Sequence, residues 1–349
     1  MTVGGAFSSI VGQERARDFL KEVLAREKMP HAYLFTGIPG VGKTSMARAL
    51  ALALNCEAPE DGDSCGRCPA CRRMLSGNFP DFVSVRCRPD KQKILIEQIR
   101  DLNRELRFPP HSEGFRVCVV QEAERMTEEA ANAFLKTLEE PPPRNILILN
   151  TVEPRDLLST IVSRCQRVSF RPLPRGAMAK WLAENMDVPG ETGELLARIS
   201  GGSLGLARKM LAHHFLETRE KWISRLLEVP GLTRERCLDM AGRCESETGK
   251  GAGIASRDGT PGLTDLIDVW ETWYRDLLVL KSGGSAALLM NVDFSHQLKK
   301  ISKSAKLNLL SESIRVMDRA RQDLHRNRNR KLVMEYLVLS LNRLAGGSL

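Results

Sequence analysis

The sequence predicts an α/β nucleotide-binding domain, built on a parallel sheet with flanking helices and a small inserted metal module, followed by two all-helical domains. Short apolar runs alternate with helical patterns in the first half of the chain. A glycine-rich phosphate-binding motif follows one of these runs, and four cysteines are clustered soon after it. Strand–helix alternation is typical of domains in which helices cover a mostly parallel sheet.

Three apolar runs predict the buried strands of this sheet, at residues 32–35, Arg116–Val120 and Asn145–Thr151. Helical patterns predict helices at Lys43–Leu54 and at residues 130–140. Three prolines beginning at Pro141 end the second helix, because proline cannot continue a helical hydrogen-bond ladder.

The chain has 349 residues, enough for two or three domains of about 150 residues or fewer. We expect the nucleotide-binding domain at residues 1–170 with the metal module at about 56–71, a helical lid at 171–212 and a helical C-terminal domain at 213–349. The lid should contain two or three helices with a break at Gly201-Gly202. Residues 247–262, rich in glycine and serine, predict a mobile loop. A last helix at about 330–344 should pack in a bundle or at a subunit contact through Leu332, Val333, Tyr336, Leu337 and Leu341.

The charge favours a polyanionic partner such as DNA. The formal net charge is +9 and the isoelectric point is about 9.2, and phosphates attract such a surface. The alternative is that this charge only aids solubility. Aromatic residues make up 5% of the chain, which argues against a single-strand binder built on base stacking.

The nine cysteines predict metal ligation in a reducing compartment rather than disulfides. Residues 1–7 show no secretory leader, and apolar runs such as 146–149 are too short to span a bilayer. We therefore expect a cytoplasmic protein without a membrane partner.

The strongest motif is the phosphate loop, which matches the pattern GxxxxGK[ST] between a strand and a helix. Its backbone N–H groups should surround phosphates, while Lys43 reaches the β- and γ-phosphates and the Thr44 hydroxyl binds Mg²⁺. ATP with Mg²⁺ is the expected ligand, although an occupied site that turns over poorly and a retained but empty loop both stay open. The predicted nucleotide-binding residues here are Gly37, Gly40, Val41, Gly42, Lys43, Thr44 and Ser45.

The second strand ends in Gln121-Glu122, where a phosphate-loop protein usually carries Asp-Glu. A neutral amide at Gln121 is a weaker partner for hydrated Mg²⁺ than a carboxylate. Glu122 could still polarise a water molecule and is the candidate catalytic carboxylate. Efficient hydrolysis by this site is therefore doubtful.

Four cysteines with the spacing C-x8-C-x2-C-x2-C follow the phosphate-loop helix: Cys56, Cys65, Cys68 and Cys71. Four thiolates form a closed tetrahedral set, so we expect a structural Zn²⁺. A redox role would need one reactive CxxC pair rather than four thiols at this spacing. The remaining five, Cys87, Cys118, Cys165, Cys237 and Cys244, are expected to be ordinary thiols.

At these motifs the chain resembles the AAA+ clamp-loader subunits of bacterial DNA polymerase III. The likeness is strong over about residues 1–210 and weak beyond. Several unrelated motifs occur in the family's order: Ile10-Val11-Gly12-Gln13, the run Pro30-His31-Ala32-Tyr33-Leu34-Phe35 before the phosphate loop, the four cysteines, Asn132-Ala133-Phe134-Leu135-Lys136-Thr137-Leu138-Glu139-Glu140-Pro141-Pro142, and Ser163-Arg164-Cys165.

Within this family, three departures favour the delta prime type, a non-motor stator, over the gamma/tau type of ATPase motor. Gln121 replaces the aspartate, no arginine follows Gly202-Ser203 in the lid, and the long C-terminal extension of tau is missing. The motor type is the alternative. Two further classes are a zinc-dependent repair or helicase-like protein and a metabolic kinase, and the sequence offers no helicase motif or substrate signature for either.

The resemblance implies a hetero-pentamer with gamma/tau and delta subunits that loads the sliding clamp onto primer–template DNA, as part of a nucleotidyltransferase holoenzyme. Arg164 would enter the ATP site of the neighbouring subunit, where a guanidinium offsets the charge on the transferred phosphoryl group. The alternative is a surface arginine at a helix end. The chain's own phosphate loop would face the gap in the ring.

The resemblance also places Val11 near the adenine, Thr151 as a sensor at its strand end, and the C-terminal helices in a collar. An ordinary strand-end threonine is the alternative for Thr151. The helix with Asn132 and Lys136 would lie near duplex DNA, with backbone contacts only. Its alternative is a scaffold helix packed through Phe134 and its apolar neighbours.

Overall fold

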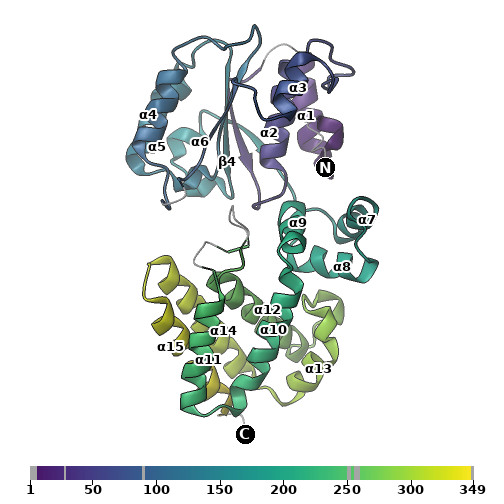
Figure 1. Ribbon diagram of the computed structural model, residues 1–349, viewed down its shortest axis with the longest axis vertical. Coiled ribbons are helices and arrows are strands. Elements are labelled where there is room, and N and C mark those ends of the chain that lie inside the picture. Colours follow the sequence, from purple (N-terminus) through teal and green to yellow (C-terminus); the bar gives the residue numbers. More distant parts are fainter. Residues whose placement is uncertain (1–5, 27–28, 89–90, 250–252, 255–259, 347–349) are drawn as a thin grey trace. The chain divides into compact units, whose positions relative to one another are not determined.

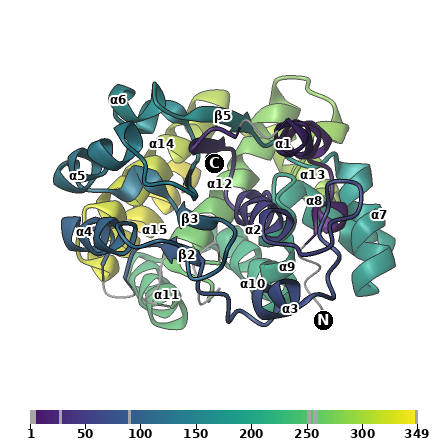
Figure 2. The same cartoon turned by 90° about the horizontal axis from the view of Figure 1, so that it is seen from above.

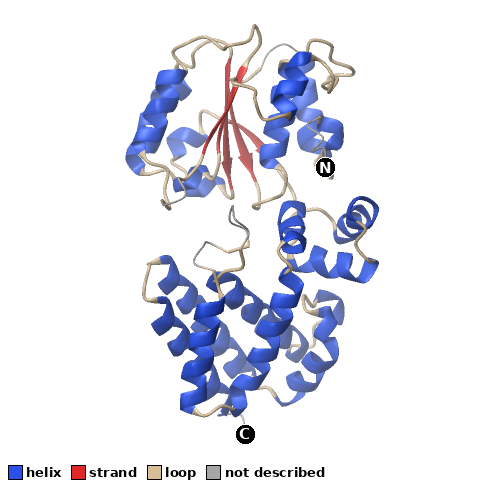
Figure 3. Cartoon of the chain, viewed as in Figure 1, coloured by secondary structure: helices blue, strands red, loops and turns tan. Residues whose placement is uncertain are grey.

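The computed structural model describes residues 6–26, 29–88, 91–249, 253–254 and 260–346. The chain divides into two compact units, Met1–Leu173 and Pro174–Leu349, each described by itself below. Figure 1 traces both units, and Figure 3 shows that all strands belong to the first. Among the described residues, no helix combines the length and apolarity needed to cross a bilayer.

Unit 1 is built on five parallel strands in the order β2-β3-β4-β1-β5. Register pairs such as Thr36 with Thr151 and Val120 with Leu149 align the strand ends. Because all strands run the same way, their carboxyl ends meet at one edge, where α/β proteins bind ligands. The strands are β1 (Ala32–Thr36), β2 (Phe82–Val85), β3 (Arg116–Val120), β4 (Asn145–Thr151) and β5 (Gln166–Ser169).

Helices cover both faces of the sheet, on opposite sides in Figures 1 and 2. Successive strand residues point to opposite faces, so Tyr33 and Phe35 join one apolar core while Ala32 and Leu34 join the other. The first core is closed by α1 (Glu14–Ala25), α2 (Lys43–Leu54) and α3 (Pro69–Leu75), and the second by α4 (Ile96–Glu105), α5 (Glu128–Glu139) and α6 (Ser159–Val162).

The predicted fold class is confirmed, and three strands and the phosphate-loop helix lie where the sequence predicted them. Helix α5 begins two residues earlier than expected, because the Thr127 hydroxyl accepts from the Ala130 N–H at 3.2 Å and caps it. Strands β2 and β5 were not predicted. Each has four residues at an edge of the sheet with only one fully buried side chain, so neither has the long apolar run of a central strand.

Unit 2 is helical, and its described residues form no strand. From Arg175 to Ala212 it contains three helices, and the predicted break is present as Gly201 and Gly202 with φ of 60° and 81°. Half of the predicted loop at 247–262, namely residues 250–252 and 255–259, lies outside the described residues. The helices are α7 (Arg175–Met186), α8 (Gly190–Ile199), α9 (Leu204–Ala212), α10 (Phe215–Glu228), α11 (Arg234–Glu247), α12 (Leu263–Lys281), α13 (Ser295–Ser304), α14 (Leu307–His325) and α15 (Arg330–Gly346).

The apolar stripe predicted on the last helix is divided between the interior and the surface of unit 2. Val333, Leu337 and Leu341 are buried in α15. Leu332 and Tyr336 are exposed, and Arg319 of α14 lies over the Tyr336 ring at 5.3 Å. Packing against α11 and α14 therefore explains three of the five positions.

A buried ion pair joins β2 to β3 in unit 1. Asp81 precedes β2 and is 0% exposed, and Arg116, which begins β3, is 1% exposed. Arg116 Nε lies 3.4 Å from Asp81 Oδ1, and Arg116 also donates to the carbonyls of Glu105, Phe108 and Pro109. Burial would raise the pKa of Asp81, but hydrogen bonds from Ser112 and His111, together with Arg116, lower it.

We predict that Arg116→Met destabilises the chain by about 3–5 kcal/mol, because Asp81 stays buried without its cation. Urea unfolding followed by circular dichroism measures this loss. The matched control is Arg104→Met, which breaks a pair whose side chains are 72% and 61% exposed and should cost less than about 1 kcal/mol. Equal losses in both variants would contradict the prediction. Since the folded pKa of Asp81 is lowered, its contribution in the wild type is present above about pH 4 and is lost at lower pH.

Candidate functional site

The phosphate loop joins β1 to α2 at the carboxyl edge of the sheet. Gly37, Gly40 and Gly42 have φ of 145°, 74° and 111°, a region that favours glycine. A Cβ on Gly37 would lie 2.6 Å from the carbonyl oxygen of Phe170. The glycines therefore let the loop curl closely against the end of β5, with its N–H groups at the start of a helix, the geometry that favours anions.

Lys43 begins α2 and is folded back onto its own loop. Its Nζ donates to the carbonyls of Gly37 and Ile38, the second at 3.1 Å. Burial lowers the pKa of Lys43 to about 8, against the opposing effect of the carboxylates of Glu124 and Glu122. A phosphate in the loop would replace the two carbonyls as the partner of this cation.

The side chain of Asn150, which was not among the predicted site residues, bonds to a residue of the phosphate loop, whereas the hydroxyl of the predicted Thr151 bonds elsewhere. Asn150 Nδ2 donates to Thr44 Oγ1 at 3.1 Å. The residue is 3% exposed, and its Oδ1 has no hydrogen-bond partner among the described residues. The Thr151 hydroxyl instead donates to Glu153 O at 3.2 Å, while the Thr151 carbonyl accepts from Gly37 N–H. An amide inside an otherwise apolar strand was the signal that could have identified Asn150.

At the end of β3, Gln121 occupies the position at which a carboxylate of aspartate is usual. Gln121 Nε2 donates to Ser84 Oγ of β2 at 2.7 Å. Glu122 has a left-handed backbone, φ 52°, and its carboxylate lies 3.4 Å from Arg125 with half of the side chain exposed. Glu124 carries a buried oxygen, Oε2, that has no hydrogen-bond partner in the described part of the chain. Glu124 is thus a further carboxylate near Lys43 that the sequence analysis did not name.

Arg164 follows α6 and is held by an ion pair within the chain. Its Nη2 donates to Glu139 Oε1 at 2.6 Å and its Nη1 to Thr160 O at 2.9 Å. The side chains of Arg164 and Glu139 are 35% and 49% exposed. The guanidinium therefore lies at the surface with a weak local partner.

The N-terminal motif is anchored through Gln13, which is 4% exposed. Gln13 Nε2 donates to Arg171 O at 2.7 Å and to Val41 O at 3.4 Å, and Gln13 Oε1 accepts from Arg171 N–H. Val11 lies two residues before this contact and is half-buried. The motif is therefore joined to the phosphate loop at Val41.

Helix α5 presents the two residues expected near DNA on its exposed side. Asn132 and Lys136 are exposed, one turn apart, while Phe134 and Leu138 are buried in the core. The helix therefore packs as a scaffold and leaves Lys136 available to a partner.

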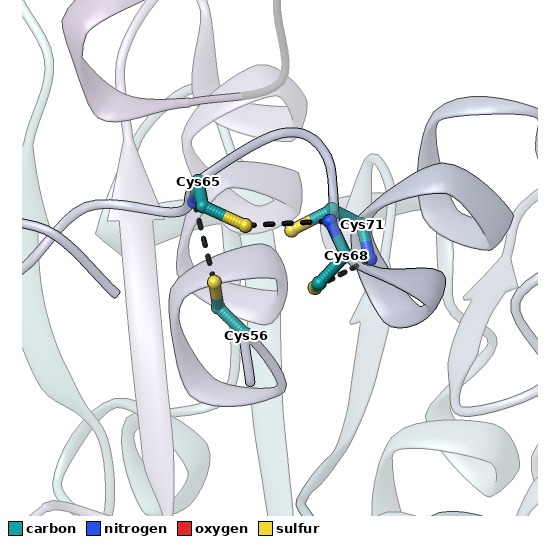
Figure 4. A group of neighbouring side chains, drawn as sticks. All are labelled: Cys56, Cys65, Cys68 and Cys71. Atoms are coloured by element: carbon teal, nitrogen blue, oxygen red, sulfur yellow. Dashed lines mark hydrogen bonds between the residues drawn. The ribbon is translucent and has the colours of Figure 1, made fainter. Parts of the chain in front are cut away.

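The four predicted cysteines converge after α2 (Figure 4). Their sulfur atoms all lie within 4.8 Å of one another, and none of the four forms a disulfide. Sulfurs at the corners of a zinc tetrahedron would be roughly 3.8 Å apart, given a Zn–S distance of about 2.3 Å. A small contraction would bring the cluster to that geometry, so it is consistent with a structural zinc site.

Backbone N–H groups already point at three of these sulfurs. Cys65 N–H donates to Cys56 Sγ at 3.2 Å, Cys68 N–H to Cys65 Sγ at 3.4 Å, and Cys71 N–H to Cys68 Sγ at 3.4 Å. Hydrogen bonds from the N–H groups of Arg67 and Cys68 lower the pKa of Cys65 to about 6, while burial raises the pKa of Cys71. Such N–H groups stabilise the thiolates that bind a metal.

The sequence is similar to subunits of DNA polymerase III. Residues 12–174 match the family described as DNA polymerase III, delta subunit. The chain is 28% identical to DNA polymerase III subunit tau of Bacillus subtilis, over 96% of this chain and 61% of that protein. It is 29% identical to subunit delta' of the same organism, over 94% and 96%, and 36% identical to subunit tau of Escherichia coli, over 57% and 31%.

The chain thus spans less than two thirds of either tau protein but nearly all of the Bacillus delta'. It also aligns with the crystal structure of a DNA polymerase III gamma subunit-related protein from Thermotoga maritima, with 22% identity, a TM-score of 0.43, and coverage of 94% of this chain and 99% of that one. From its motifs and these sequence likenesses, the chain belongs to the family of DNA polymerase III clamp-loader subunits that comprises delta prime and gamma/tau.

Proposed function

We propose that this chain is a delta prime type of clamp-loader subunit, a stator that supplies an arginine to a neighbouring ATPase and is itself a poor ATPase. It would act in the cytoplasm with gamma/tau and delta subunits, in an assembly that places the sliding clamp on primer–template DNA. Residues 171–212 would form its lid and residues 213–349 its share of the collar.

The observation that carries the proposal is the hydrogen bond from Gln121 to Ser84. It directs the side chain at the end of β3 toward β2, and the amide carries no charge for a hydrated Mg²⁺. In the lid, Gly202-Ser203 leads into Leu204, Gly205 and Leu206, and the Ser203 hydroxyl caps α9 by accepting from Leu206 N–H at 3.2 Å. A phosphoryl-transfer site needs a carboxylate at the end of β3 and an arginine in the lid, and this chain carries other residues at both positions.

Arg164 would act on the neighbour rather than on this chain's own nucleotide. An ion pair this exposed contributes about 0–1 kcal/mol, so exchanging Glu139 for a triphosphate costs little. At the neighbouring site the guanidinium would meet an oxygen-rich, developing negative charge, where a bidentate cation stabilises the transition state more than the ground state.

The chain's own loop fits a nucleotide in several respects. Its glycines admit phosphates, Lys43 is a cation that lies against carbonyls, and the unpaired oxygens of Asn150 and Glu124 could accept hydrogen bonds from metal-bound water. We propose that Thr44, which is bonded to Asn150, would hold Mg-ATP together with Glu124 near Lys43, and that Glu122 retains at most slow hydrolysis. The four cysteines would hold one structural Zn²⁺, which contributes folding energy and no chemistry.

A gamma/tau type of motor is the second candidate, favoured by the intact phosphate loop and by the likeness to Bacillus tau across most of this chain. It requires efficient hydrolysis by a site with Gln121 at the end of β3. The ATPase rate of the isolated chain distinguishes the two candidates.

The arginine is tested by Arg164→Ala in the complete assembly with gamma/tau, delta, clamp and primed DNA. We expect hydrolysis at the neighbouring site to fall by about 10³-fold, as for other arginines supplied in trans. The control is Arg167→Ala, which removes an exposed arginine on β5 near Arg164 and should leave the rate unchanged. A vigorous ATPase in the chain alone, with little effect of Arg164→Ala, would replace the stator with the motor.

The lowered pKa of Lys43 predicts how nucleotide binding depends on pH. The Lys43 cation loses its proton above about pH 8. Affinity for ATP should therefore be constant near pH 7 and should fall above pH 8 by up to about tenfold per pH unit. Lys43→Arg keeps its charge and should flatten the profile. Titration with a fluorescent ATP analogue measures both, and a flat wild-type profile to pH 9.5 would contradict the assignment.

Substitutions of Asn150 and of Thr151 should affect the Mg²⁺-dependent binding of ATP differently. Asn150→Ala removes the bond to Thr44 and should weaken Mg-ATP binding by about tenfold, the effect of roughly one hydrogen bond, with less effect when EDTA is present. Thr151→Val removes only the bond to Glu153 O and should have little effect. If Thr151→Val weakens Mg-ATP binding more than Asn150→Ala does, Thr151 rather than Asn150 is the sensor residue.

A further inference from the structure

The structure connects the four-cysteine module, residues 56–71, to the phosphate loop through a third segment. This N-terminal segment, residues 7–13, contacts the module at one end and the loop at the other. Phe7 is fully buried in the core that α1, α2 and α3 close, so the segment is packed into unit 1 rather than lying free on its surface.

Asp63 makes the contact at the module end. It lies between Cys56 and Cys65, and its carboxylate accepts from the N–H groups of Phe7 and Ser8, both at 2.9 Å. The same carboxylate accepts from Ser64 N–H at 2.8 Å. Two contacts thus bridge more than fifty residues of sequence.

A tight turn presents this carboxylate. Glu60 and Asp63 exchange backbone hydrogen bonds of 3.0 and 2.8 Å. The two residues between them, Asp61 and Gly62, have φ of 50° and 71°, the pattern of a type I′ turn. Lys21 of α1 donates to the Asp61 carbonyl at 3.2 Å. The turn is therefore held from both sides, and Asp63 has little freedom to leave the N-terminal segment.

The negative charge of Asp63 belongs to this contact. Its carboxylate accepts three backbone N–H groups, from Phe7, Ser8 and Ser64. Hydrogen bonds to a charged acceptor are about twice as strong as hydrogen bonds to a neutral one. An asparagine here would keep an acceptor oxygen and lose that advantage.

Gln13 makes the contact at the other end of the segment. Its amide bonds to Val41 O within the phosphate loop and, in both directions, to the backbone of Arg171. A displacement of the N-terminal segment would therefore act on the phosphate loop at Val41 and on the chain that follows β5.

We propose that the zinc-bound module positions the phosphate loop, through Asp63 and the N-terminal segment, so that zinc and nucleotide binding reinforce each other. Asp63 is a positioning residue and touches neither ligand. A metal that joins Cys56 to Cys65 closes the loop carrying Asp63 and reduces the conformations available to it. Because coupling between two sites is reciprocal, bound nucleotide should also slow zinc loss. The inference rests on the proposed function for the identity of the two ligands.

The test is hydrogen–deuterium exchange on the full chain, without nucleotide, comparing wild type with Asp63→Asn and Asp63→Ala. The peptides to follow cover residues 6–13 and 37–44. We expect exchange in both peptides to be faster by about tenfold in Asp63→Ala, less in Asp63→Asn, and faster again in wild type stripped of zinc by a chelator. Zinc content, by elemental analysis, should stay near one per chain in both variants.

Asp61→Asn is the matched control. It removes the same charge two residues away, leaves the Asp61 carbonyl for Lys21, and tolerates the left-handed backbone because asparagine favours it. Its exchange should equal that of wild type. Unchanged exchange of 37–44 in Asp63→Ala, or an equal change in Asp61→Asn, would overturn the proposal. Gln13→Ala tests the contact at the other end of the N-terminal segment. When it is combined with Asp63→Ala, the two effects on hydrogen exchange in residues 37–44 should be less than additive, because both substitutions act along one connection.

Binding measurements separate this inference from the proposed function. Asp63→Asn should weaken binding of the fluorescent ATP analogue by about three- to tenfold without loss of zinc, and ATP should slow the chelation of zinc from wild type but not from Asp63→Ala. A chain that binds zinc but no nucleotide would contradict the proposed nucleotide site. Hydrogen exchange in residues 37–44 would still show whether the cysteine module is coupled to the phosphate loop. A chain that takes up no zinc would overturn the zinc site and the coupling together.

Discussion

The parallel pairing of β1 with β4 and β5 is the constraint on which the rest of unit 1 depends. It brings the carboxyl ends of all five strands to one edge, so residues far apart in sequence, such as Thr44 and Asn150, meet there. The same pairing places Phe170, just beyond β5, against Gly37. Without that alignment the loop would have the right residues and no partners for them.

Polar contacts around this edge serve two different purposes. The contacts of Gln13 and Asn150 hold the phosphate loop from the N-terminal side and from β4, and those of Asp63 join the cysteine module to the N-terminal segment. The oxygens left unpaired on Asn150 and Glu124 are different. Buried acceptors without donors cost free energy in the folded chain, and such a cost is expected at this edge if it holds the hydrated cation proposed above.

The surroundings of Arg164 are compatible with both interpretations of this residue. It is a surface arginine at a helix end, held by Glu139. It is also accessible and weakly paired, which is what delivery to another subunit requires. A deeply buried pair would be more rigid, but releasing the arginine from it would leave the carboxylate uncompensated and would oppose assembly.

The sequence by itself determined the alternation of strands and helices, the phosphate loop and the four candidate metal ligands, because each depends on local pattern or short spacing. It placed β1, β3 and β4 but not β2 and β5, whose edge positions require only short, half-buried runs. Only the tertiary structure decided that the side chain of Asn150, rather than that of Thr151, bonds to Thr44 of the phosphate loop, that Gln121 turns toward Ser84, and that Asp63 reaches Phe7. Those contacts join segments tens of residues apart, and which side chains meet depends on strand register and on the direction of each side chain from its strand.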